Sequence, residues 1–318
     1  MNNRNLSLDI LRILACFAVV MLHTAGSPIV HGFVSVGTCE YSGCLILDAI
    51  SRWSVPVFAM LTGFFMLDSA KELPIKKLFS KYILRLVTAL LFWSVFYALT
   101  LHVAFYPFGS QEGHFWYVGM CIGLYLAMPI MRLIAANERV LAYFCWTWLA
   151  IKCYQFIGAF AILPINLQDV LFVDYVGYCL FAYYLKSITQ SIKVRIAIYA
   201  LGIIGIVVTV CVALWTQNAD TAFFYYTAPN VMMTAMALFV FFLYHPIRVK
   251  ESVANAITMV SRCTFGIYLV HIWILIQIFF RLHRFIPNSF ILCLVCAPVV
   301  FLGGGCYYVN NKQNKICK

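Results

Sequence analysis

The stretch LSLDILRILACFAVVMLHTAG, residues 6–26, is long and apolar enough to enter a bilayer, yet it carries Asp9, Arg12 and His23. An ionisable side chain at membrane depth is costly and normally faces a protein interior or a watery cavity. At about 100° per residue, these three and Cys16 fall within about 60° of one another, with roughly 16 Å of helical rise between Arg12 and His23. The stripe predicts either a polar cavity beside this helix, or a helix that begins at Asp9 and Arg12 and buries a hydrogen-bonded histidine.

The rest of the chain is equally hydrophobic. Of its 318 residues, 64% are hydrophobic and 10% are charged, whereas about a quarter are charged in soluble domains. This composition predicts a multi-pass membrane protein in contact with membrane lipids. The net charge of +11 could indicate nucleic acid, but the basic residues gather in every second loop, as in the positive-inside pattern. We therefore expect no nucleic-acid partner, and we interpret the N-terminal segment as an uncleaved first span.

Ten segments of this sequence are predicted to span the membrane. They are Leu6–Ala25, Gly43–Leu67, Phe79–His102, Trp116–Ile134, Val140–Leu163, Val170–Leu185, Val194–Trp215, Ala228–Tyr244, Met259–Phe280 and Phe290–Val309. With the N-terminus inside, basic residues cluster at the inner loops, and the outer loops hold only Arg281 and Arg284. The sequence thus predicts an all-α, polytopic transmembrane helical bundle of about ten spans with both termini cytoplasmic. Residues 1–318 are expected to form a single domain with no appended soluble domain.

The cysteines and the second span leave alternatives open. The thirteen cysteines show no metal-ligand spacing, so no metal is expected, although Cys39 and Cys44 could form a disulfide in an oxidising compartment. In the second span, Pro56 can kink the helix and expose a carbonyl to a polar cavity. Arg52 is either the ion-pair partner of Asp48 one turn earlier or a ligand for an anion.

A basic ladder enters the third span and includes Lys81 and Arg85, predicted one helical turn apart on one face. Such a ladder usually anchors a helix among anionic headgroups, and it would also suit the phosphates of a nucleotide cofactor. Deeper in the membrane lie His23, Arg52, Lys152 and His271, too many costly groups for a purely structural bundle. They predict a polar cavity, which a transporter and an intramembrane enzyme would both have.

Five short motifs occur in order along the chain. They are Asp9 with Arg12 and His23; Ser51–Phe58 followed by Thr62 and Gly63; Lys81 with Arg85; His114 and Trp116 with Tyr117, Tyr125 and Pro129; and Ser261, Thr264, Gly266, Ile267, Tyr268 and His271. Together they resemble the acyltransferase 3 family of integral membrane acyltransferases. The resemblance is closest to the short members that O-acetylate surface polysaccharides such as enterobacterial common antigen. Thr62, Lys81, Tyr117 and Thr264 depart from the residues more usual in that family.

The resemblance implies an enzyme of the bacterial inner membrane that moves an acetyl or other short acyl group from cytoplasmic acyl-CoA to a glycan hydroxyl. The glycan acceptor would be polymeric or lipid-linked. The phosphates of acetyl-CoA would bind four cations at the inner face: Lys81, Arg85, Arg12 and Arg132. His23 would act as general base or form an acyl-histidine, with Asp9 holding Arg12. The acceptor site would be lined by Arg52, Trp116, Tyr117, Tyr268 and His271, with Arg52 stabilising an oxyanion.

The competing interpretation is an exporter of a polysaccharide or small amphiphile, with a buried pathway of histidines and arginines. Many transporters contain inverted repeats, and we find no internal repeat in this sequence. The absence of a repeat favours the acyltransferase over the exporter.

Overall fold

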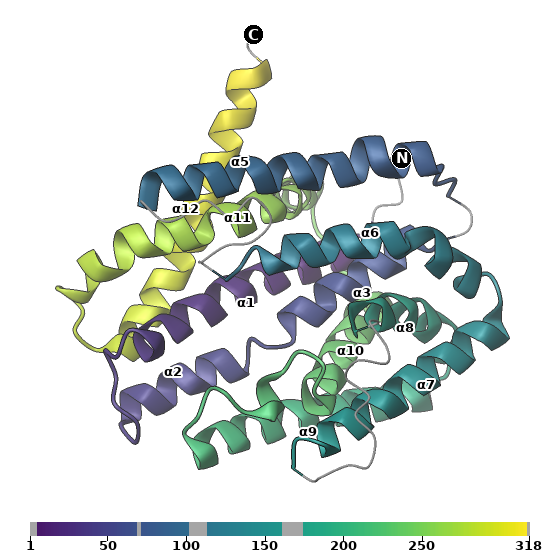
Figure 1. The fold of residues 1–318 in the computed structure, drawn as a ribbon, viewed down its shortest axis with the longest axis horizontal. Helices are drawn as coiled ribbons and strands as arrows, with labels where there is room; N and C mark the ends of the chain where they lie inside the picture. The colour runs from purple at the N-terminus through teal and green to yellow at the C-terminus, as the bar shows by residue number, and fades with distance from the viewer. Residues whose placement is uncertain (1–4, 69–70, 102–112, 161–173, 317–318) are drawn as a thin grey trace. The chain divides into compact units, whose positions relative to one another are not determined.

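The computed structural model describes residues 5–68, 71–101, 113–160 and 174–316, with side chains up to Gly305. Within these ranges the chain is helical and contains no strand, which confirms the predicted all-α bundle. The elements are α1 (Leu6–Val30), α2 (Cys39–Ala49), α3 (Ser54–Met66), α4 (Ile75–Lys77), η1 (Leu78–Ile83), α5 (Leu84–Leu101), α6 (Trp116–Ala135), α7 (Glu138–Ile157), α8 (Asp174–Ile188), α9 (Ile192–Thr216), η2 (Ala222–Phe224), α10 (Pro229–Tyr244), α11 (Glu251–His283) and α12 (Ser289–Ile316). Figure 1 traces them in chain order.

Eight helical segments in the described ranges are long and apolar enough to cross a membrane. Two further predicted spans correspond to shorter helices, since α8 has 15 residues and the apolar part of α12 covers Ser289–Gly305. The predicted spans Val140–Leu163 and Val170–Leu185 extend into residues 161–173, which lie outside the described part of the chain. The chain is therefore a multi-pass helical membrane protein.

The helices pack as two compact units. The first unit contains residues 1–58, 152–166 and 188–318, and the second contains residues 59–151 and 167–187.

In the first unit, α1 packs against both α11 and α12 (Figure 1). Cys16 contacts Thr264, and His23 contacts His271. Because residue numbers increase in the same direction along both helices, α1 and α11 are parallel. Phe17 packs on Phe301, whereas Thr24 accepts a bond from the thiol of Cys293, so α12 runs antiparallel to α1. The beginning of α1 and the end of α12 consequently lie on the same side of this unit.

Glycines bring α9 and α10 together in the same unit. A Cβ added to Gly202 would lie 2.1 Å from the Cβ of Ala237, and one added to Gly205 would lie 2.3 Å from the carbonyl oxygen of Asn230. Small residues let helix backbones approach closely in a membrane. The Asn230 amide also donates to the Thr209 hydroxyl at 2.8 Å. Substituting a larger residue at either glycine would force the helices apart.

The second span is broken instead of kinked. Helix α2 ends at Ala49, α3 begins at Ser54, and Pro56 lies in the first turn of α3, where a missing backbone N–H costs little. Arg52 therefore lies in the break between two helices. The disulfide left open by the sequence is absent, since Cys39 is an exposed free thiol and Cys44 is a buried one.

Candidate functional site

The polar stripe of α1 faces α11. Four residues of this stripe, Asp9, Arg12, Cys16 and His23, each contact a residue of α11. Helix α1 begins at Leu6, with the Asn5 side chain accepting a bond from the backbone of Leu8, so the helix does not begin at Asp9 and Arg12. We call these four residues and their contacts on α11 the polar seam of the first unit. The predicted cavity beside the seam stays a prediction.

A pair of histidines forms the end of the seam that lies farther along α1 and α11. The ring centroids of His23 and His271 are 5.1 Å apart, with an angle of 47° between their planes. His271 is 0% exposed, whereas His23 is partly exposed. Nδ1 of His271 lies 2.5 Å from the carbonyl oxygen of Tyr268. A carbonyl can only accept, so Nδ1 carries the proton and, in the neutral ring, Nε2 is the basic nitrogen. The Tyr268 ring also packs 5.5 Å from the His271 ring.

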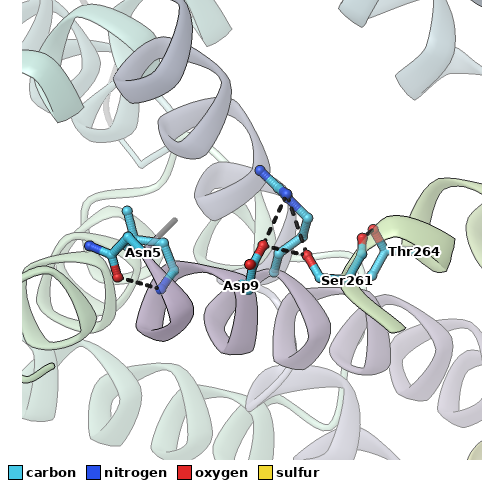
Figure 2. A network of polar contacts seen from close by, with 6 residues as sticks. Asn5, Asp9, Ser261 and Thr264 are labelled. Carbon is cyan, nitrogen blue, oxygen red and sulfur yellow. Dashed lines mark hydrogen bonds and ion pairs between the residues drawn. The ribbon is translucent and has the colours of Figure 1, made fainter. Parts of the chain in front are cut away.

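A second polar cluster joins the two helices at the other end of the seam. Ser261 donates its hydroxyl to Oδ1 of Asp9 at 2.7 Å, and Arg12 donates to the Ser261 hydroxyl at 3.4 Å. Nη1 of Arg12 lies 3.5 Å from Oδ1 of Asp9. Figure 2 shows Asp9 and Ser261 turned toward one another from α1 and α11. Asp9 is buried, whereas the Arg12 side chain is 28% exposed, so a fixed carboxylate holds a partly accessible cation.

These two clusters are separate along α1. His23 follows Arg12 by eleven positions in the chain, which corresponds to roughly 16 Å of helical rise. Asp9 lies one turn before Arg12 and contacts both Arg12 and Ser261, so it belongs to the second cluster and not to the histidine pair. It is therefore placed to position Arg12 and too far along the helix to orient His23.

Arg52 lies in the break between α2 and α3. Nη2 of Arg52 is 2.5 Å from Oδ2 of Asp48, which confirms the predicted ion pair. Nη1 donates to the carbonyl oxygen of Phe224 at 3.3 Å, and the guanidinium lies 5.0 Å from the centre of the Phe224 ring.

The Asp48–Arg52 pair is not fully hydrogen-bonded. Oδ1 of Asp48 and Nε of Arg52 are buried and make no hydrogen bond with the described residues. Buried polar atoms in native proteins nearly always have a partner in protein or water. The ion pair therefore does not exclude a ligand role for Arg52, because one acceptor and one donor remain for water or substrate.

The basic ladder lies in the second unit, and its helix is irregular. Lys81 falls within η1, a π-helical turn, whereas Arg85 follows in α5, and both side chains are exposed. A π-turn contains more residues than an α-turn. Lys81 and Arg85 consequently do not have the simple one-turn α-helical spacing that the sequence predicts. Neighbouring Tyr82 packs on Tyr125, with 5.7 Å between ring centroids.

Arg132 has a structural role in the second unit. Its Nη1 donates to the carbonyl oxygens of Met66 and Asp68 at 2.7 and 3.2 Å, and its Nη2 donates to that of Lys71 at 2.7 Å. Arginines commonly satisfy the free carbonyls at a helix end in this way. The guanidinium thus fixes the chain after α3, and its predicted contact with a phosphate stays a prediction.

The aromatic residues Trp116 and Tyr117 begin α6 in the second unit. Trp116 is 42% exposed, and its ring centroid lies 5.7 Å from that of Tyr175. Lys152 is buried in the first unit and donates to the Gln155 side chain at 2.7 Å. Among the described residues, no three His, Cys, Asp or Glu side chains are grouped so as to hold a metal.

Ser261 is the site residue to which the sequence assigns no role, and the pairing of His23 with His271 is likewise found only in the structure. A spacing signal existed, because Cys16 and His23 are seven residues apart, as are Thr264 and His271. Two helices with polar residues at a shared seven-residue interval can pack along that one stripe. The shared interval matches the α1–α11 contacts, but by itself it does not select these two helices as partners.

The fold and its polar seam define the class: a multi-pass helical membrane protein. The chain matches the acyltransferase 3 family model, described as an acyltransferase domain, over residues 5–308, and it belongs to this family. Comparisons with curated proteins and with solved structures gave no match. Family membership supports a membrane acyltransferase and disfavours the exporter.

Proposed function

We propose that this protein transfers an acetyl group from cytoplasmic acetyl-CoA to a hydroxyl of a cell-surface polysaccharide or of its lipid-linked precursor. We propose further that it does so as a single domain in the bacterial inner membrane, with both termini in the cytoplasm. The observation that carries the proposal is the His23–His271 pair at one end of a seam whose other end holds Arg12. The exporter interpretation accounts less well for a buried histidine pair in a chain of this family.

The histidine pair suits general-base chemistry. Two imidazoles whose centroids are 5.1 Å apart disfavour double protonation, because like charges repel at short range. At least one ring therefore remains neutral and able to accept a proton. His23 is partly exposed, and His271 is fully buried with its Nδ1 bonded to Tyr268. We assign proton transfer to His23 and its positioning to His271.

In the proposed reaction, His23 accepts the proton of the acceptor hydroxyl while that oxygen attacks the thioester carbonyl. The negative charge that develops on the carbonyl oxygen is stabilised by Arg52, whose guanidinium is held by Asp48. Collapse of the intermediate breaks the carbon–sulfur bond, and the CoA sulfur leaves with the proton from His23. In the covalent alternative, His23 attacks first and carries the acetyl group to the acceptor.

The donor would approach from the Arg12 end. Arg12 is partly exposed and fixed by Asp9, so it can contact a phosphate without reordering its own side chain. Separately, we propose that Lys81 and Arg85, exposed cations of the second unit, bind phosphate as the sequence predicts. The roughly 16 Å of helical rise between Arg12 and His23 suits an extended pantetheine arm.

Replacement of His23 tests the proposal. We expect His23→Ala to lower the rate of acetyl transfer from labelled acetyl-CoA by about 10²- to 10⁴-fold, the usual contribution of general acid–base catalysis. The protein should still fold and bind acetyl-CoA. His31→Ala is the matched control, because His31 is an exposed histidine at the C-cap of the same helix. Transfer that survives His23→Ala in well-folded protein would exclude His23 as the base.

A further inference from the structure

An apolar groove lies in the first unit, lined by residues different from those of the polar seam. Its volume is about 350 Å³, within the range of about 300–1,000 Å³ typical of ligand pockets. Its walls come from α9, α10 and the break between α2 and α3, and include Ile50, Trp53, Ile203, Ile206 and Phe241. Ile203 is 65% exposed, and Ile50 and Phe241 are also exposed large apolar side chains, so the groove opens on the outer surface of the unit.

Close helix packing and the helix break together form the groove. Gly202 and Ala237, which line its floor, have no side chains long enough to fill the space between α9 and α10. The Trp53 indole N–H donates to the carbonyl oxygen of Ile50 at 2.7 Å, which satisfies a carbonyl at the break. Because this indole N–H is already hydrogen-bonded, the Trp53 ring contributes an apolar face to the groove. This part of the groove is therefore suited to a hydrocarbon chain.

One end of the groove is polar and basic. Tyr199 lines this end, and its ring is 6.1 Å from that of His245 at the end of α10. Arg195 lies one turn before Tyr199 on α9, with its guanidinium 4.4 Å from the centre of the Tyr244 ring. The Tyr199 hydroxyl and Nε of Arg195 are buried and make no hydrogen bond with the described residues. The exposed Lys193 adds a second cation at this end of α9.

We propose that this groove binds one acyl chain of an anionic glycerophospholipid, with the lipid phosphate at Arg195. Charge complementarity supports this occupant. The apolar part of the groove would hold the hydrocarbon chain, and the cations and the Tyr199 hydroxyl at its end would bind the phosphate. A zwitterionic lipid would present the same chain with an added positive charge beside Arg195 and Lys193. The proposal goes beyond acyl transfer, and its test does not depend on enzymatic activity.

Trp53 provides a direct probe. The purified full chain is titrated with phosphatidylglycerol or phosphatidylcholine carrying brominated acyl chains, which quench nearby tryptophans. Because the chain has seven tryptophans, the Trp53 signal is taken as the difference between the wild-type protein and Trp53→Phe. We expect half-maximal quenching at an about fivefold lower mole fraction of phosphatidylglycerol, the preference typical of one cation near an anionic headgroup.

Variants separate the headgroup contact from the chain contact. Arg195→Gln should abolish the preference for phosphatidylglycerol, and Arg195→Lys should retain it and show that the fold tolerates substitution. Ile203→Phe, which narrows the groove, should weaken quenching by both lipids. Ile204→Phe is the matched control, because Ile204 is an exposed neighbour that does not line the groove.

Three outcomes would overturn the proposal. Equal quenching by the two lipids would show a groove filled by bulk lipid without headgroup recognition. A preference that persists in Arg195→Gln would remove the phosphate contact from Arg195. Displacement of brominated phosphatidylglycerol by a lower mole fraction of a polyisoprenyl phosphate would identify an isoprenoid occupant in place of the diacyl lipid.

Discussion

Two arginines, Arg12 on α1 and Arg132 on α6, are held in different ways. Arg12 contacts one carboxylate and one hydroxyl at 3.4–3.5 Å and keeps 28% of its side chain exposed. Arg132 donates three bonds to main-chain carbonyls, two of them at 2.7 Å. A guanidinium has five N–H donors, and Arg132 commits three such bonds to the backbone. The two guanidiniums therefore differ in what holds them: side chains of two helices hold Arg12, whereas main-chain carbonyls hold Arg132.

Among these residues, Arg12 is expected to have the largest effect on the binding of acetyl-CoA. We expect Arg12→Ala to raise the KM for acetyl-CoA roughly ten- to hundredfold, since a hydrogen bond to a charged group contributes about 1.5–3 kcal/mol. Steady-state kinetics with labelled acetyl-CoA would measure this. The matched control is Arg262→Ala, an exposed arginine adjacent to Ser261. An unchanged KM would place Arg12 in the same structural class as Arg132.

Arg132 should show the opposite behaviour. Arg132→Ala should lower the free energy of unfolding by about 1.5–3 kcal/mol, because it leaves carbonyls after α3 without their charged donor. The KM for acetyl-CoA of the folded fraction should not change. Thermal unfolding in detergent, compared with Arg139→Ala at the exposed start of α7, would measure the loss. A raised KM with unchanged stability would contradict the structural role and return Arg132 to the phosphate site.

The smallest effect is expected at Ser261, which acts on the proposed donor site only through Arg12 and Asp9. Ser261→Ala should raise the KM for acetyl-CoA about two- to tenfold with little change in kcat. The hydroxyl contacts Arg12 at only 3.4 Å and the Asp9–Arg12 ion pair remains without it, so we expect a loss of about 0.5–1.5 kcal/mol. Ser261→Thr, which keeps the hydroxyl, should restore the KM, and Ser252→Ala on the exposed first turn of α11 is the control. A loss confined to kcat would contradict the positioning role.

Much of this architecture could be predicted from the sequence. Apolar runs long enough to cross a bilayer predict the helices, because every backbone polar group in lipid must be satisfied within its own segment. The same argument predicts that the stripe of Asp9, Arg12 and His23 faces protein, since charge in lipid is costly. The i, i+4 spacing of Asp48 and Arg52 likewise predicts their ion pair, and the pair forms although Arg52 lies just beyond the end of α2.

Only the tertiary structure decided which distant residues meet. His23 and His271, and Asp9 and Ser261, are about 250 residues apart in the chain, and no local rule of helix geometry joins them. The role of Arg132 depends on carbonyls more than sixty residues earlier, at the end of another helix. The π-turn that carries Lys81 is likewise a departure from regular helical periodicity. Local sequence determines which residues share a helical face, whereas packing between helices determines which of those faces meet.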